Sequence, residues 1–126
     1  MAGLTLDTGA LIGFERAERR TLAQLKVAQQ LGYELTVPTA VIVEAWRGGP
    51  RSARIAALLE GCIVEPLLFD LARVAGEAIA AVRRATVVGA VVMASAARRG
   101  DPVLTSDLTD LERLCSYFPE VRLLQA

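Results

Sequence analysis

The sequence predicts a single α/β domain built on a mostly parallel sheet that is covered by helices on both faces. Three observations lead to this fold class. Short apolar runs, too short for helices, alternate with longer segments of helical periodicity along the chain. Glycine or proline stands at many of the boundaries between them. The length of 126 residues suits one hydrophobic core, so we expect one domain over residues 1–126.

Five apolar runs are predicted to be the strands of the sheet. Each is short and bounded by turn residues, which favours a buried strand over a helix. In chain order they are Gly3–Leu6, Glu34–Val37, Cys62–Pro66, Pro102–Thr105 and Val121–Leu124.

Seven segments between the strands are predicted to be helices. Asp7 or Thr8 caps the first of them, and Gly32 ends the second. In the second helix, apolar side chains recur at helical spacing through Leu22, Leu25, Val27, Ala28 and Leu31. The seven segments are Gly9–Phe14, Arg19–Leu31, Thr39–Arg47, Arg51–Leu59, Leu68–Arg84, Thr86–Arg99 and Leu108–Leu114.

The sixth helix is predicted to be covered by other elements on nearly all sides. Residues 87 to 97 are almost entirely valine, alanine and methionine and show no polar stripe. Arg98, Arg99 and Gly100 supply the basic last turn and the glycine that end such a helix. Gly89 fits poorly in its first turn, because a helical glycine costs about 1 kcal/mol relative to alanine.

Composition excludes several classes of protein and of chemistry. No apolar run approaches the roughly 20 residues that span a bilayer, and no secretory signal is visible, so a cytoplasmic protein without membrane contact is expected. Cys62 and Cys115 are expected to be reduced core residues. The formal net charge is zero, so binding to nucleic acid requires a local patch. Histidine is absent, which leaves carboxylates, hydroxyls and bound ions for any catalysis.

Four acidic residues follow predicted strands. Asp7 follows the first strand, Glu44 lies in the helix after the second, and Asp107 and Asp110 come after the fourth. A single aspartate at such a place is more often a helix cap, and Glu44 can either reach solvent or point into a cleft. Together, however, positions that follow parallel strands meet in one crevice. Carboxylates gathered there repel each other unless a cation intervenes, and Mg²⁺ or Mn²⁺ suits an all-oxygen set. Such a site supports metal-dependent nuclease chemistry.

Four motifs in this order resemble a PIN domain, specifically the VapC-type toxin of a toxin–antitoxin pair. The motifs are L-D-T-G-A-L-I at 6–12, V-I-V-E-A-W-R at 41–47, V-V-G-A-V-V-M-A-S-A-A-R-R-G at 87–100 and L-T-S-D-L-T-D-L at 104–111. The resemblance implies an α/β/α endoribonuclease that uses Mg²⁺ or Mn²⁺, forms a homodimer and is neutralised by a cognate antitoxin. By position it makes Asp7, Glu44 and Asp107 catalytic metal ligands with Asp110 as a further ligand. Thr8, Thr105 and Ser106 would assist them.

Gly89 departs from this family pattern, which places an aspartate at the third acidic position. Three explanations stay open: an inactivating substitution, a loss tolerated in a weak enzyme, or a glycine that permits close helix packing. Our hypothesis is that Gly89 weakens metal binding and cleavage while the fold and the partner surface persist.

Two arginines beside Glu44 are the best candidates for contacts to RNA. Arg47 and Arg51 flank a Gly-Gly-Pro loop next to the predicted crevice. Two classes of function therefore remain open, an endoribonuclease and a PIN-like binding protein that no longer cuts. A phosphatase-like or response-regulator-like domain with Asp7 as nucleophile is disfavoured, because no lysine follows the later strands.

Overall fold

A parallel five-stranded sheet forms the centre of the chain in the computed structural model, which describes residues 2–126. The spatial order is β3-β2-β1-β4-β5, and every neighbouring pair is parallel. This confirms the predicted fold class. The strands are β1 (Gly3–Leu6), β2 (Glu34–Pro38), β3 (Ile63–Glu65), β4 (Val103–Thr105) and β5 (Leu123–Gln125).

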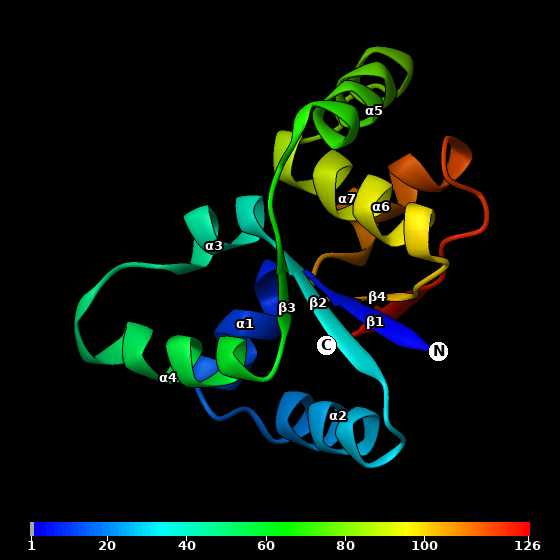
Figure 1. Ribbon diagram of the computed structural model, residues 1–126. Coiled ribbons are helices and arrows are strands. Elements are labelled where there is room, and N and C mark those ends of the chain that lie inside the picture. The colour runs from blue at the N-terminus through cyan, green and yellow to red at the C-terminus, as the bar shows by residue number, and fades with distance from the viewer. Residues whose placement is uncertain (1) are drawn as a thin grey trace.

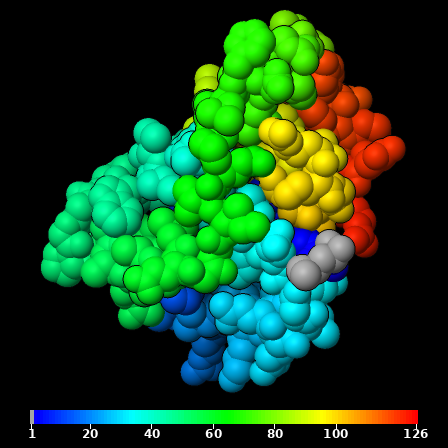
Figure 2. Space-filling view, viewed as in Figure 1, coloured from blue at the N-terminus to red at the C-terminus, as the bar shows by residue number. Residues whose placement is uncertain are grey.

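Helices cover both faces of the sheet and form the outer layers of the domain (Figure 1). On one side lie α5 (Phe69–Ala81), α6 (Val87–Arg99) and α7 (Leu108–Glu112), the last continued by a 3₁₀ turn over Arg113–Ser116. On the other side lie α1 (Thr8–Glu15), α2 (Arg19–Gln30) and α4 (Gly49–Glu60). Helix α3 (Thr39–Ala45) stands at the carboxyl edge, and the segment joining it to α4 projects from the body on the left of Figures 1 and 2.

Helix α6 is the most deeply buried helix, as its composition predicts. Eight consecutive residues from Gly89 to Ala96 are buried. The helix begins after Thr86, whose side-chain oxygen accepts a hydrogen bond from the Gly89 N–H at 3.0 Å. It ends at Gly100, which adopts the left-handed conformation at a φ of 73° that glycine takes without strain.

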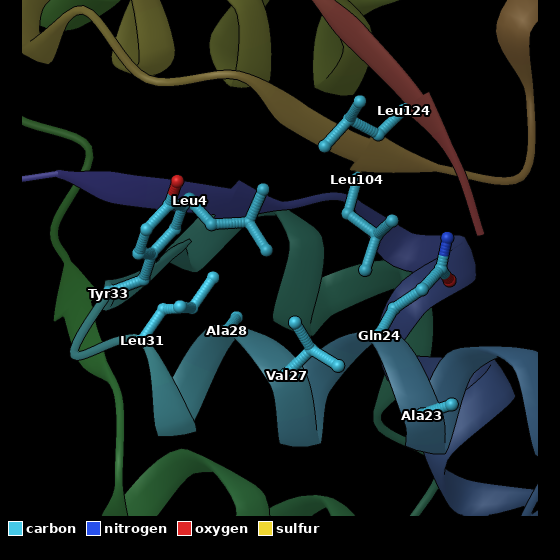
Figure 3. Close-up of a pocket in the computed structure, with 9 residues that line it drawn as sticks. All are labelled: Leu4, Ala23, Gln24, Val27, Ala28, Leu31, Tyr33, Leu104 and Leu124. Atoms are coloured by element: carbon cyan, nitrogen blue, oxygen red, sulfur yellow. The ribbon is translucent and has the colours of Figure 1, made fainter.

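Helix α2 does not bury its whole apolar stripe. Val27 is 52% exposed and Leu31 is 66% exposed, although both lie on the stripe at helical spacing. They line an apolar groove of about 330 Å³ with Leu4, Leu104 and Leu124 of the sheet (Figure 3). Periodicity thus located the apolar face of α2 correctly, but the sheet covers only part of it.

Several helix boundaries differ from those predicted. Helix α5 stops at Ala81 rather than Arg84, because Val82 is extended and Arg84 has a φ of 63°. Helix α3 ends at Ala45, and α4 begins earlier than predicted, with proline in its first turn where a missing N–H costs nothing.

Two further predictions concern membrane contact and the state of the cysteines. Along residues 2–126, we find no helix that combines the length and the apolar character needed to span a bilayer. Cys62 and Cys115 are both free thiols, and burial raises the pKa of Cys62 to about 11.

Candidate functional site

The carboxyl edge of the sheet contains a crevice between β1 and β4. The chain runs from β1 to its neighbour β2 on one side, whereas β4 pairs with β1 on the other, so the direction of winding changes here. Loops diverge at such a point and leave a place for ligands. The Asp7 N–H donates to the Leu104 carbonyl at 3.0 Å, which holds the residue after β1 against β4.

A pocket of about 280 Å³ lies in this crevice, and all four predicted acidic residues line it. Asp7 comes from the end of β1, Glu44 from α3, and Asp107 and Asp110 from the start of α7. The remaining wall consists of Thr8, Gly9, Ile12, Thr86, Val88, Gly89 and Ser106. The lining therefore includes no lysine or arginine. We call this cavity the acid pocket.

Asp7 is the most buried acid of the pocket, with 8% of its surface exposed. Its Oδ2 atom accepts a hydrogen bond from the Thr105 hydroxyl at 2.8 Å. Burial raises the pKa of Asp7, and the nearby charges of Glu44 and Asp107 raise the pKa further. The bonds from Thr105 and from the Thr8 backbone lower the pKa but do not cancel this effect. The ionised form of Asp7 is thus held in surroundings that lack a compensating cation.

The predicted supporting residues hold the acids through hydrogen bonds. The Thr8 hydroxyl donates to Glu44 Oε1 at 2.6 Å, which links α1 to α3. Thr105 accepts from the Asp107 N–H at 2.9 Å while it donates to Asp7. Ser106 packs so closely on the first turn of α1 that a side chain at Gly9 would overlap it. These contacts fix the two loops that carry Asp7 and Asp107.

Asp110 is held by residues that the sequence did not single out. Its Oδ2 atom accepts from the Thr86 hydroxyl at 3.1 Å, and its Oδ1 atom pairs with Arg113 at 3.2 Å. Thr86 also caps α6, so one hydroxyl serves both the helix and the acid pocket. The available signal for Thr86 was a cap before an apolar helix, and for Arg113 it was the spacing of three residues from Asp110 on one helix.

Gly89 lies on the wall of the acid pocket, so the position at which the resemblance predicts an acid does face the other acids. A Cβ atom there would come within 2.6 Å of Thr86 Oγ1 and 3.3 Å of Asp110 Oδ2. The space beside Gly89 is therefore occupied by the pair formed by Thr86 and Asp110. This close approach supports the explanation that the glycine permits close packing.

The chemistry of the acid pocket fits Mg²⁺ or Mn²⁺ better than softer metals, since all its candidate ligands are oxygens. Within residues 2–126, however, no three acidic or thiol side chains stand close enough together to hold an ion in this conformation. Side-chain rotation would have to bring the acids together. The oxygen ligands suit Mg²⁺ or Mn²⁺, but in this conformation the acidic side chains of residues 2–126 are too far apart to coordinate an ion together.

The two predicted RNA-contacting arginines lie outside the acid pocket but next to it. Arg47 and Arg51 line a neighbouring cavity that shares Ile12 and Glu44 with the acid pocket.

Together, the fold and the acid pocket define a class of protein: a single α/β domain with carboxylates gathered at the switch point of a parallel sheet. No protein-family model and no curated protein sequence matches the chain. Solved structures do share its fold.

Three of these structures cover nearly the whole chain. VapBC2 from Rickettsia felis bound to a promoter DNA fragment aligns with a TM-score of 0.78 at 10% identity, covering 98% of each chain. DNA-bound VapBC from Salmonella typhimurium aligns with a TM-score of 0.72 at 18% identity, covering 99% of this chain and 98% of that one. FitAcB from Neisseria gonorrhoeae aligns with a TM-score of 0.64 at 14% identity, covering 96% of each. At these identities the similarity establishes the fold alone.

Proposed function

We propose that the chain is a PIN-like, VapC-type toxin with a metal-dependent endoribonuclease site, and that Gly89 weakens its cleavage of RNA. One observation carries the proposal: Asp7, Glu44, Asp107 and Asp110 line one pocket that no cationic side chain lines. Among residues 2–126, Asp110 pairs with Arg113, whereas Asp7, Glu44 and Asp107 form no ion pair. Carboxylates without a counter-charge in a cleft are typical of a site that takes a cation from solution. The fold shared with VapBC and FitAB proteins supports the same family.

Asp7, Glu44 and Asp107 would hold Mg²⁺ or Mn²⁺, with Asp110 as a further ligand. When bound, such an ion makes a water more acidic and stabilises charge on a phosphodiester. The chain's own residues orient the ligands. The Thr105 hydroxyl holds one oxygen of Asp7, and the Thr8 hydroxyl holds one oxygen of Glu44. Burial of Asp7 makes its negative charge costly without a cation, which favours binding of the ion.

The proposed partners are a cognate antitoxin, an RNA substrate and a second copy of the chain in the cytoplasm. The antitoxin is supported by the fold that the chain shares with VapBC and FitAB complexes. The homodimer follows from the family resemblance. Large apolar side chains that reach solvent, including Val43, Phe69 and Val87, are consistent with protein contacts.

Cleavage and ion binding test the proposal together. We expect a single-stranded RNA to be cut slowly with Mn²⁺ or Mg²⁺ and not at all with EDTA. Mn²⁺ should raise the melting temperature, since an ion at 100 times its Kd adds about 2.7 kcal/mol to the free energy of unfolding. Asp7→Asn should abolish both effects, whereas the exposed control Asp70→Asn should keep both. Equal Mn²⁺ stabilisation of the two variants would contradict the site.

A binding protein that no longer cuts is the second candidate. Gly89 at the third acidic position and the absence of a close ligand triad in residues 2–126 favour it. In that case Mn²⁺ would neither stabilise the chain nor support cleavage, while binding to a cognate antitoxin would persist.

A further inference from the structure

A second cavity, rich in arginine, adjoins the acid pocket. Its volume is about 220 Å³, and Ile12 and Glu44 belong to the walls of both cavities. Three arginines and two glutamates line it: Arg16, Arg47, Arg51, Glu15 and Glu44. Its charge thus has the opposite sign to that of the acid pocket, whose only charged lining residues are acids. We call it the arginine pocket.

The structure fixes the backbone that carries Arg47. The buried Ser52 side chain accepts hydrogen bonds from the backbone N–H groups of Arg47 and Gly48, at 3.1 and 2.9 Å. One guanidinium nitrogen of Arg47 donates to the carbonyls of Val43 and Trp46, at 3.2 and 2.9 Å. This leaves the other nitrogens of the guanidinium available to a ligand.

The other two arginines, Arg16 and Arg51, contribute little to the stability of the fold. Arg51 pairs with Glu15 at 3.5 Å, but 71% of its side chain is exposed, and such a pair contributes little to stability. Arg16 follows the last turn of α1 and is exposed, and no ion pair or side-chain hydrogen bond involves it among the described residues. Fold stability therefore does not explain why three arginines gather beside Glu44.

We propose that the arginine pocket binds a backbone phosphate of single-stranded RNA, the one next to the phosphate that lies in the acid pocket. Guanidinium groups match phosphate oxygens with paired hydrogen bonds. The acid pocket repels a polyanion, and the chain has no net positive charge, so a local cationic contact is needed to keep the strand in place. The proposal rests on the proposed function and adds Arg16 and Glu15 to it. Glu15 restrains Arg51 and competes with the phosphate for it.

Binding without divalent ions tests the pocket separately from cleavage. The probe is a fluorescent, fully 2′-O-methylated RNA of about ten nucleotides in EDTA, followed by anisotropy across a range of salt concentrations. Arg16→Gln and Arg51→Gln should each weaken binding several-fold, and the two together should reduce the salt slope by up to about 0.7, the value for one lost phosphate contact. Glu15→Gln should strengthen binding, because it frees Arg51. The control Arg122→Gln removes an exposed arginine from the opposite edge of the sheet and should change neither quantity.

The outcomes separate this proposal from the nuclease. If Arg16→Gln and Arg51→Gln bind like the unchanged chain, or if Arg122→Gln weakens binding as much as they do, the arginine pocket is not a phosphate site. If the arginine variants lose affinity but no RNA is cut with Mn²⁺, the pocket stands and the nuclease proposal fails.

Discussion

Two clusters of acidic side chains lie near β1, and they differ in the source of their counter-charge. Beneath α6, Glu65 and Asp101 both pair with Arg99, at 2.8 and 3.1 Å. Arg99 also donates to Thr5 and Ser95, at 2.7 and 2.9 Å. In the acid pocket, hydroxyls are the side-chain partners of Asp7 and Glu44, and Arg113 reaches only Asp110.

This difference distinguishes a structural cluster from a candidate site. The Arg99 cluster is complete, because its acids and hydroxyls find partners within the chain. In the acid pocket, burial and neighbouring charges raise the pKa of Asp7, so the folded chain holds a carboxylate in unfavourable surroundings. A cluster of acidic residues does not by itself indicate a cation site. A cluster whose acids have no basic side chain as a partner does.

The largest effect is expected from removing the counter-charge of the complete cluster. Arg99→Met should lower the free energy of unfolding by about 3 kcal/mol, because it leaves the half-buried Glu65 and the buried Asp101 with hydroxyl partners but no counter-charge. Urea denaturation measures this loss. Arg98→Met changes an exposed neighbour and should stay within about 0.5 kcal/mol of the unchanged chain. A similar small effect for Arg99 would mean that the cluster does not depend on its cation.

A smaller effect is expected from placing an acid at position 89. Gly89→Asp should increase metal-dependent RNA cleavage at least about tenfold, worth about 1.4 kcal/mol of barrier, because it adds a carboxylate to the pocket wall. Gly89→Ala is the matched control, since its Cβ atom crowds Thr86 and Asp110 in the same way without adding a charge. Equal cleavage by the two variants would show that Gly89 is not what limits activity.

The smallest effect is expected from the charge of Asp7 itself. Its pKa is raised in the folded chain, so the folded state binds more protons than the unfolded state between the two pKa values, and stability falls as pH rises through that window. Asp7→Asn should therefore melt at a higher temperature than the unchanged chain at pH 7 in EDTA. The gap should close below the ordinary aspartate pKa of 3.8, where Asp7 is protonated in both states. A gap independent of pH would contradict this cause.

The sequence predicted the parts of the fold that local chemistry decides. Gly32 and Gly100 both adopt positive φ where they were expected to end helices, and the five strands lie within two residues of their predicted bounds. The sequence also predicted that four acids lie at one edge of the sheet, because the carboxyl ends of parallel strands lie at the same edge.

What the sequence could not predict depends on contacts between distant residues. Thr105 and Asp7 are 98 positions apart, and Arg99 and Glu65 are 34 apart. Periodicity could not show that Val27 and Leu31 face a groove, because coverage depends on neighbouring elements. The end of α5 at Ala81 left no local signal, since the helical pattern continues to Arg84.

The double role of Thr86 makes the first turn of α6 sensitive to events in the acid pocket. Its hydroxyl accepts from the Gly89 amide and donates to Asp110 at the same time. A ligand that draws Asp110 away changes the orientation of that hydroxyl and with it the protection of a single amide proton. Proton exchange at Gly89, followed by NMR, would thus report occupancy of the pocket without any substrate.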